Sequence, residues 1–110
     1  MTSNTSIARN YIEAFARKDI ETISTLLSET ASLRDWDVEI PESKEKVLDF
    51  MQSIFSSVES IEAEVLHYYS AESAVVIEMN LHIDKQTLKV VDVISFCEDS
   101  TIKAIRAYQG

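Results

Sequence analysis

Apolar residues follow a helical period in the first part of the chain and an alternating period later. From residue 6 to about residue 18, and again from 20 to 27, apolar side chains recur every three or four positions, which predicts two amphipathic helices. Asp19 is placed to cap the second of them. A third helix is predicted to begin near Ser43, because a stripe of the same period follows the loop that contains Pro41.

Five segments are predicted to be strands, and they lie at residues 31–36, 60–69, 74–83, 87–97 and 102–108. Short polar turns separate the last four, which is typical of a meander. Because the helices come first and most strands later, the sequence predicts an α+β architecture with helices on one face of an antiparallel sheet and no parallel winding. With 110 residues and no linker or repeat, the chain is predicted to form one domain over residues 1–110.

Composition narrows the possible functions. The net charge of −9 argues against nucleic acid as a partner, since such partners are bound through clustered Lys and Arg. No apolar run reaches the ~20 residues of a membrane span, and the N-terminus lacks the pattern of a secretory signal, so we expect a cytoplasmic protein. The single cysteine, Cys97, excludes an internal disulfide. The only glycine, Gly110, is at the end of the chain, which excludes a phosphate-binding glycine loop.

Three polar side chains fall on faces that are otherwise apolar. Tyr11 lies in the inward stripe of the first helix, where its hydroxyl needs a hydrogen-bond partner. The alternation of residues 31–36 places Asp35 on the apolar side of the first strand. Asp92 falls in the row of aliphatic residues on one face of segment 87–97.

These three groups allow enolisation chemistry. A carboxyl group buried among aliphatic side chains favours its neutral form and can donate a hydrogen bond, so Asp92 and Tyr11 could stabilise an oxyanion while an ionised Asp35 removes a proton from the adjacent carbon. Each residue also has an ordinary alternative: a tyrosine on an inner stripe is usually a core residue, and an aspartate at a strand end often only reaches water. The pattern by itself leaves both interpretations open.

Two further features concern ligands and partners. His67 and His82 lie on different predicted strands without acidic or cysteine residues at ligand spacing, so no metal site is predicted. The outward face of segment 87–97 carries apolar side chains such as Val91 and Val93, followed by Ser95 and Cys97, and a homodimer through the sheet is therefore expected.

The sequence resembles the ketosteroid isomerases, members of the nuclear-transport-factor-like or SnoaL-like superfamily that also includes polyketide cyclases and limonene epoxide hydrolases. The resemblance rests on the stretches ARNYIEAFARKDIETI, LLSETASLRDW, VLDFMQSIF, VIEM, LKVVDVISF and IKAIRAY. It implies a cone-shaped α+β barrel, whose curved sheet wraps around the N-terminal helices and encloses a pocket. By motif, Tyr11, Asp35 and Asp92 match the catalytic tyrosine and aspartates of that family. Trp36 stands where many relatives have a proline, so the resemblance does not define the substrate.

The activity that the resemblance implies is a cofactor-independent isomerase, which moves a double bond in a small hydrophobic enone, steroid-like or polyketide-like, through a dienolate. Its expected substrate-binding residues are Phe15, Trp36, Met51, Phe55, Met79, Val90 and Ile94. Aromatic and methionine side chains at these periods are also common in cores. The alternatives are a polyketide cyclase, another lyase or hydrolase using the same pocket, or a dimeric domain that only binds a small ligand.

Overall fold

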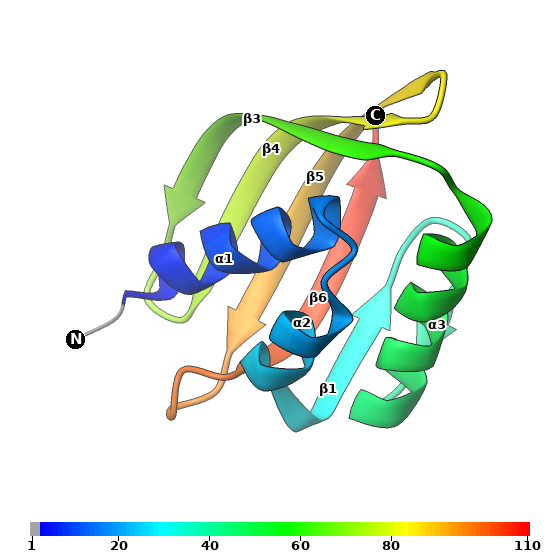
Figure 1. Ribbon diagram of the computed structural model, residues 1–110. Helices are drawn as coiled ribbons and strands as arrows, with labels where there is room; N and C mark the ends of the chain where they lie inside the picture. Colours follow the sequence, from blue (N-terminus) through cyan, green and yellow to red (C-terminus); the bar gives the residue numbers. More distant parts are fainter. Residues whose placement is uncertain (1–2) are drawn as a thin grey trace.

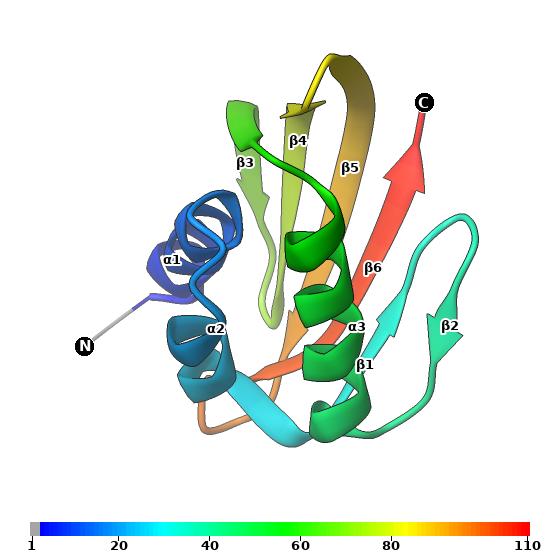
Figure 2. The ribbon, with the colours of Figure 1, turned by 45° about the vertical axis from the view of Figure 1, so that its right-hand side comes forward.

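The computed structural model describes residues 3–110 and places three helices against one face of a six-stranded, curved and unclosed sheet (Figures 1 and 2). The helices are α1 (Asn4–Ala16), α2 (Ile20–Leu26) and α3 (Lys44–Ser57). The strands are β1 (Leu27–Arg34), β2 (Glu39–Ile40), β3 (Ile61–Ser70), β4 (Ala74–Ile83), β5 (Gln86–Phe96) and β6 (Ile102–Gln109). The predicted α+β class is confirmed, while Met1 and Thr2 of the predicted domain lie outside the described residues.

The strands follow one another across the sheet in the order β2-β1-β6-β5-β4-β3. From β3 to β6 they form the antiparallel meander that the sequence predicts. One pair differs from the antiparallel expectation, since β1 runs parallel to β6. These two strands are joined only through the rest of the chain, so no hairpin turn imposes an antiparallel direction on them.

The sheet bends at irregularities in its strand pairing. The register shifts between Val65 and His67 where β3 meets β4, and between Ser95 and Phe96 where β5 meets β6. An extra residue in one strand of a pair increases the local twist and bends the strand. This curvature arises without glycine, since the only one, Gly110, follows the last strand, and it leaves room between the sheet and the helices.

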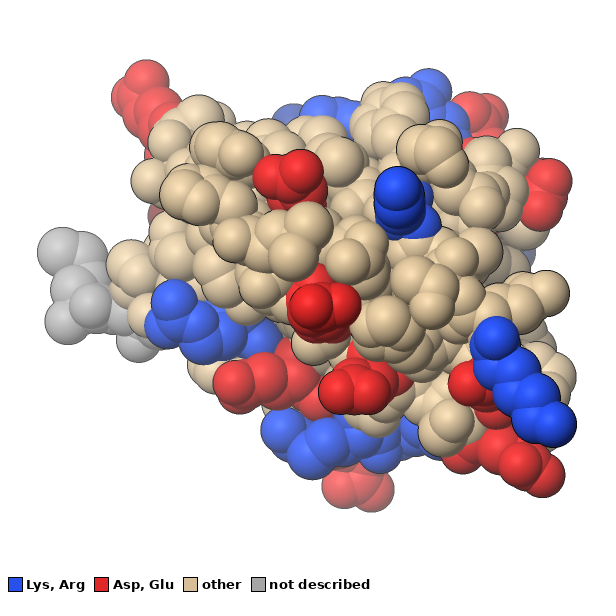
Figure 3. All heavy atoms as spheres, turned by 90° about the horizontal axis from the view of Figure 1, so that it is seen from above, with Lys and Arg blue, Asp and Glu red and all other residues tan. Residues whose placement is uncertain are grey.

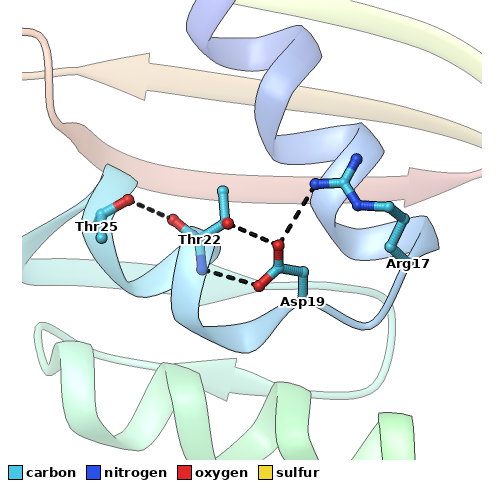
Figure 4. A network of polar contacts seen from close by, with 4 residues as sticks. All are labelled: Arg17, Asp19, Thr22 and Thr25. Carbon is cyan, nitrogen blue, oxygen red and sulfur yellow. Dashed lines mark hydrogen bonds and ion pairs between the residues drawn. The ribbon is translucent and has the colours of Figure 1, made fainter.

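A capped corner separates α1 from α2 (Figure 4). As the sequence predicts, Asp19 caps α2: its Oδ1 accepts a hydrogen bond from the Thr22 N–H at 3.1 Å, and its Oδ2 accepts one from the Thr22 hydroxyl at 2.6 Å. Lys18 precedes it in the left-handed region with φ 58°, and its Nζ donates to the Val58 and Glu59 carbonyls after α3. This corner fixes the direction of α1 across the sheet.

The first strand differs most from its prediction. Leu27 belongs to the apolar stripe of the second predicted helix, yet it begins β1. At the other end, β1 stops at Arg34, so Asp35 and Trp36, which the sequence predicts to be part of the strand, lie instead in the turn that leads into β2. The short side chain of an aspartate can bond the backbone two or three residues ahead, and this competes with strand pairing.

The side chains of the sheet alternate between a buried face toward the helices and an outer face. Along β4 and β5 every second residue is buried, including Ile77, Met79, Val90 and Ile94.

None of the helices within residues 3–110 has the length and apolar composition needed to cross a membrane. Viewed from above, a few single acidic and basic side chains lie on a mostly uncharged surface, and side chains of both signs gather along the lower edge of the view (Figure 3).

Candidate active site

A pocket of about 130 Å³ lies between α1, α3 and the inner face of the sheet. It is lined almost entirely by apolar side chains, and the few polar groups come from the three residues singled out in the sequence and from Arg34. The lining consists of Tyr11, Ile12, Phe15, Leu33, Arg34, Asp35, Trp36, Phe50, Met51, Ile54, Met79, Leu81, Ile83, Leu88, Val90, Asp92, Ile105 and Ala107. The fold therefore brings Tyr11, Asp35 and Asp92 to one cavity from α1, the β1–β2 turn and β5.

Tyr11 reaches the pocket from the buried face of α1. Only 3% of the residue is exposed, and its ring packs beside Phe15 with a centroid distance of 6.2 Å. Burial raises the pKa of the Tyr11 phenol well above 10.0, and the nearby charge of Asp92 raises it further. At neutral pH the phenol therefore keeps its proton and can act as a hydrogen-bond donor.

Asp92 points inward from the middle of β5, where Val90 and Ile94 flank it on the same face. The residue is 6% exposed, and burial raises the pKa of its carboxyl group from 3.8 to about 7. The physical cause is desolvation, because the apolar surroundings penalise the charged form. Near neutral pH a large share of Asp92 is therefore protonated and able to donate a hydrogen bond.

The polar atoms of Tyr11 and Asp92 have unused hydrogen-bonding capacity. Within residues 3–110, neither the Tyr11 hydroxyl nor the Asp92 carboxyl group makes a side-chain hydrogen bond. In that part of the chain, every side-chain oxygen or nitrogen that is fully enclosed has a hydrogen-bond partner. The polar atoms of Tyr11 and Asp92 have none, so they are not fully enclosed and must be accessible from the cavity that both residues line. Buried polar groups normally find a partner. Both groups are thus available to a molecule in the pocket.

Asp35 lies in the turn between β1 and β2 and is half-buried. Its Oδ1 accepts hydrogen bonds from the backbone N–H groups of Asp37, at 2.8 Å, and Val38, at 2.7 Å, while its own N–H donates to the Val38 carbonyl. The second oxygen, Oδ2, has no hydrogen bond within the described part of the chain. One oxygen therefore holds the turn, and the other can accept a proton from a bound molecule.

Five of the seven residues expected to bind substrate line the pocket: Phe15, Trp36, Met51, Met79 and Val90. The other two do not. Phe55 lies behind Phe15, with the two rings edge to face at a centroid distance of 5.3 Å, and Ile94 is fully buried in the core beyond Asp92 on β5. Both share the periodicity of pocket residues, but the pocket covers only part of each buried face.

The sequence prediction missed several lining residues, among them Phe50 and Ile54 on α3, and Ile83 and Leu88 on β4 and β5. These side chains are half-buried. The sequence does contain a signal for them. Each is an apolar residue at a position beside the buried stripe of a helix or near a hairpin turn, where a polar residue would also be tolerated. Such positions indicate the wall and mouth of a cavity.

No three His, Cys, Asp or Glu side chains within residues 3–110 are grouped so that they could hold a metal ion. His82 instead takes part in polar contacts on the outer face of the sheet, where its ring nitrogens lie 3.1 Å from Glu64 Oε1 and 2.9 Å from the Thr87 hydroxyl. The pocket thus places a phenol, a carboxyl group that is protonated in large part near neutral pH and a second carboxyl group around an apolar cavity. It can polarise a carbonyl group and move a proton beside it.

Comparisons with known proteins agree with this architecture. A search of the curated proteins gave no match. Among solved structures, a putative ketosteroid isomerase from Kribbella flavida DSM 17836 is similar with a TM-score of 0.84 and 15% identity, over 97% of this chain and 77% of that one. A putative SnoaL-like polyketide cyclase from Shewanella denitrificans OS-217 is similar with a TM-score of 0.86 and 16% identity, over 97% of this chain and 90% of that one.

An LEH-like epoxide hydrolase from M. tuberculosis is also similar, with a TM-score of 0.81 and 15% identity, over 97% of this chain and 82% of that one. At these identities the likeness establishes the fold and leaves the reaction open. The family match is more specific, because the model of the SnoaL-like domain matches residues 8–105. The predicted resemblance is thereby confirmed, and the chain belongs to the SnoaL-like domain family.

Proposed function

We propose that this protein is an isomerase that moves a double bond in a small hydrophobic carbonyl compound by intramolecular proton transfer. The observation that supports this most directly is the pair of unpartnered groups on the pocket wall, the Tyr11 hydroxyl and the Asp92 carboxyl. A carbonyl oxygen between them would accept two hydrogen bonds. Such donors stabilise the negative charge that develops on that oxygen when the neighbouring carbon loses a proton.

Asp35 supplies the base in this proposal. Its free Oδ2 takes a proton from the carbon between the carbonyl group and a β,γ double bond, and the electron pair of that C–H bond is delocalised into a dienolate. Protonated Asp35 then returns the proton to the γ carbon, which yields the conjugated α,β-enone. Atoms and charges balance within substrate and enzyme, so no oxidant, reductant or other co-reactant takes part.

A second candidate is a domain that binds a small ligand without transforming it. One observation favours it: Asp35 already has a structural role, since its Oδ1 accepts two backbone hydrogen bonds that close the β1–β2 turn. The cyclase reaction would use the same donors and base on a longer substrate. These candidates differ in whether a proton leaves carbon, and that can be measured.

The proposal predicts that the protein catalyses deuterium uptake from D₂O into a β,γ-unsaturated cyclic ketone, together with formation of the conjugated enone. Tyr11→Phe should reduce kcat by roughly 10²- to 10³-fold, the usual effect of removing one oxyanion donor, because the ring still packs but the hydroxyl is lost. Nuclear magnetic resonance measures the exchange, and ultraviolet absorbance measures the product.

Tyr68 packs against the core but does not line the pocket, so Tyr68→Phe is a matched control that should change kcat far less. Full activity in Tyr11→Phe would show that the hydroxyl does not act on the substrate. Binding of the ketone without any exchange by the folded wild-type protein would instead favour the binding domain.

A further inference from the structure

The pocket has a polar end and an apolar mouth. Tyr11 and Asp92 are almost fully buried, whereas other parts of the lining contain half-buried apolar side chains and Trp36, which is 43% exposed. A ligand that satisfies the two donors must therefore place its polar atom at the buried end.

The volume of the pocket limits what can be enclosed. At about 130 Å³ it is smaller than the roughly 300–1,000 Å³ of pockets that bury drug-sized ligands. It is close to the ~150 Å³ of an engineered protein cavity that takes up benzene. One six-membered ring with its carbonyl group fits this space, whereas the four fused rings of a steroid would have to remain largely outside.

The charges around the pocket select against anions. Asp35, the base of the proposed function, lines it, Asp92 becomes a second negative charge whenever it ionises, and Arg34, the cationic residue in the lining, has its guanidinium engaged elsewhere. That group donates to the Tyr108 hydroxyl at 2.8 Å and lies 5.9 Å from the centre of the Tyr108 ring. A carboxylate on the enclosed part of a ligand would therefore meet negative charge without a compensating cation.

From these three observations we infer that the substrate is a neutral monocyclic ketone, a cyclohexenone-type compound whose ring is enclosed by the pocket and carries no further fused ring. This inference rests on the proposed function for the role of the carbonyl group. Recognition itself depends only on the shape and charge of the pocket, so it can be tested separately from turnover.

Trp36 provides that test, because it is the only tryptophan in the chain and it lines the mouth of the pocket. Its fluorescence should report binding of cyclohexanone, of the bicyclic ketone 2-decalone, of a 3-ketosteroid and of 3-oxocyclohexanecarboxylate. We expect cyclohexanone to bind at least tenfold more tightly than the bicyclic, steroid and anionic compounds. N-acetyltryptophanamide titrated with the same compounds corrects for collisional quenching.

Equal or tighter binding of the steroid would overturn the size inference, and equal binding of the anion would overturn the charge inference. Tight binding of the monocyclic ketone without deuterium exchange would support the inferred ligand class while contradicting the proposed isomerase. Failure of the ligand class and failure of the reaction therefore give different results.

Discussion

Asp35→Asn is expected to reduce the rate of proton exchange by roughly 10²- to 10⁴-fold, the usual contribution of a positioned general base. The substitution removes the proton-accepting carboxylate but keeps an Oδ1 that can accept the hydrogen bonds from Asp37 and Val38. The β1–β2 turn should therefore persist, and so should the fold. This separation of chemistry from structure makes the asparagine variant more informative than a truncation.

The measurement compares deuterium uptake and thermal unfolding in wild type, Asp35→Asn and Asp35→Ala. The alanine variant loses both backbone hydrogen bonds to the side chain and should be destabilised by about 1–3 kcal/mol, while the asparagine variant stays close to wild type. Asp37→Asn, a change at an exposed neighbour, is the control for altered charge near the pocket. An asparagine variant with undiminished exchange would mean that Asp35 only closes the turn.

Asp92→Asn is expected to stabilise the protein, increasingly so as the pH rises. The folded pKa of Asp92 is about 7 and its usual value is 3.8, so between these two pH values the folded state binds more protons than the unfolded state. Stability therefore falls as pH rises through this window, and the cost is complete above pH 7. Asparagine has no charge to bury. Its advantage over aspartate should grow by roughly 3 kcal/mol between pH 5 and pH 8.

Urea unfolding of both proteins at pH 5, 6, 7 and 8 measures this difference. Asp49→Asn, at an exposed position on α3, should show an almost constant difference from wild type over the same range. A constant difference for Asp92→Asn as well would mean that the carboxyl group stays ionised in the folded protein. Asp92 would then be a hydrogen-bond acceptor in the pocket rather than a donor.

The retention of aspartate at this position has a cost that packing does not explain. A leucine or asparagine would fill the site between Val90 and Ile94 without a charge to desolvate, and replacing buried charges by neutral groups often stabilises proteins. Residues that destabilise the fold yet face a cavity are a common feature of active sites. This observation supports a role for Asp92 in the pocket, whether the protein transforms its ligand or only binds it.

The sequence by itself determined the order of elements and the inward faces. Three-and-four spacing located all three helices, alternation located the strands of the meander, and Asp19 marked the start of α2. Tyr11 and Asp92 could be identified because each sits at a fixed period within a long regular element. In such elements the side-chain direction follows from local geometry alone.

Tertiary structure decided the remaining features. The parallel pairing of β1 with β6 and the bends of the sheet arise between segments far apart in the chain, where no local pattern fixes the register. Asp35 was identified by assuming a strand that in fact ends one residue earlier, and its turn became visible only through the hydrogen bonds that Asp37 and Val38 donate. Phe55 and Ile94 have the periodicity of lining residues but lie in the core. Periodicity shows which side chains are buried, whereas the packing of helices on the curved sheet decides which of them face a cavity.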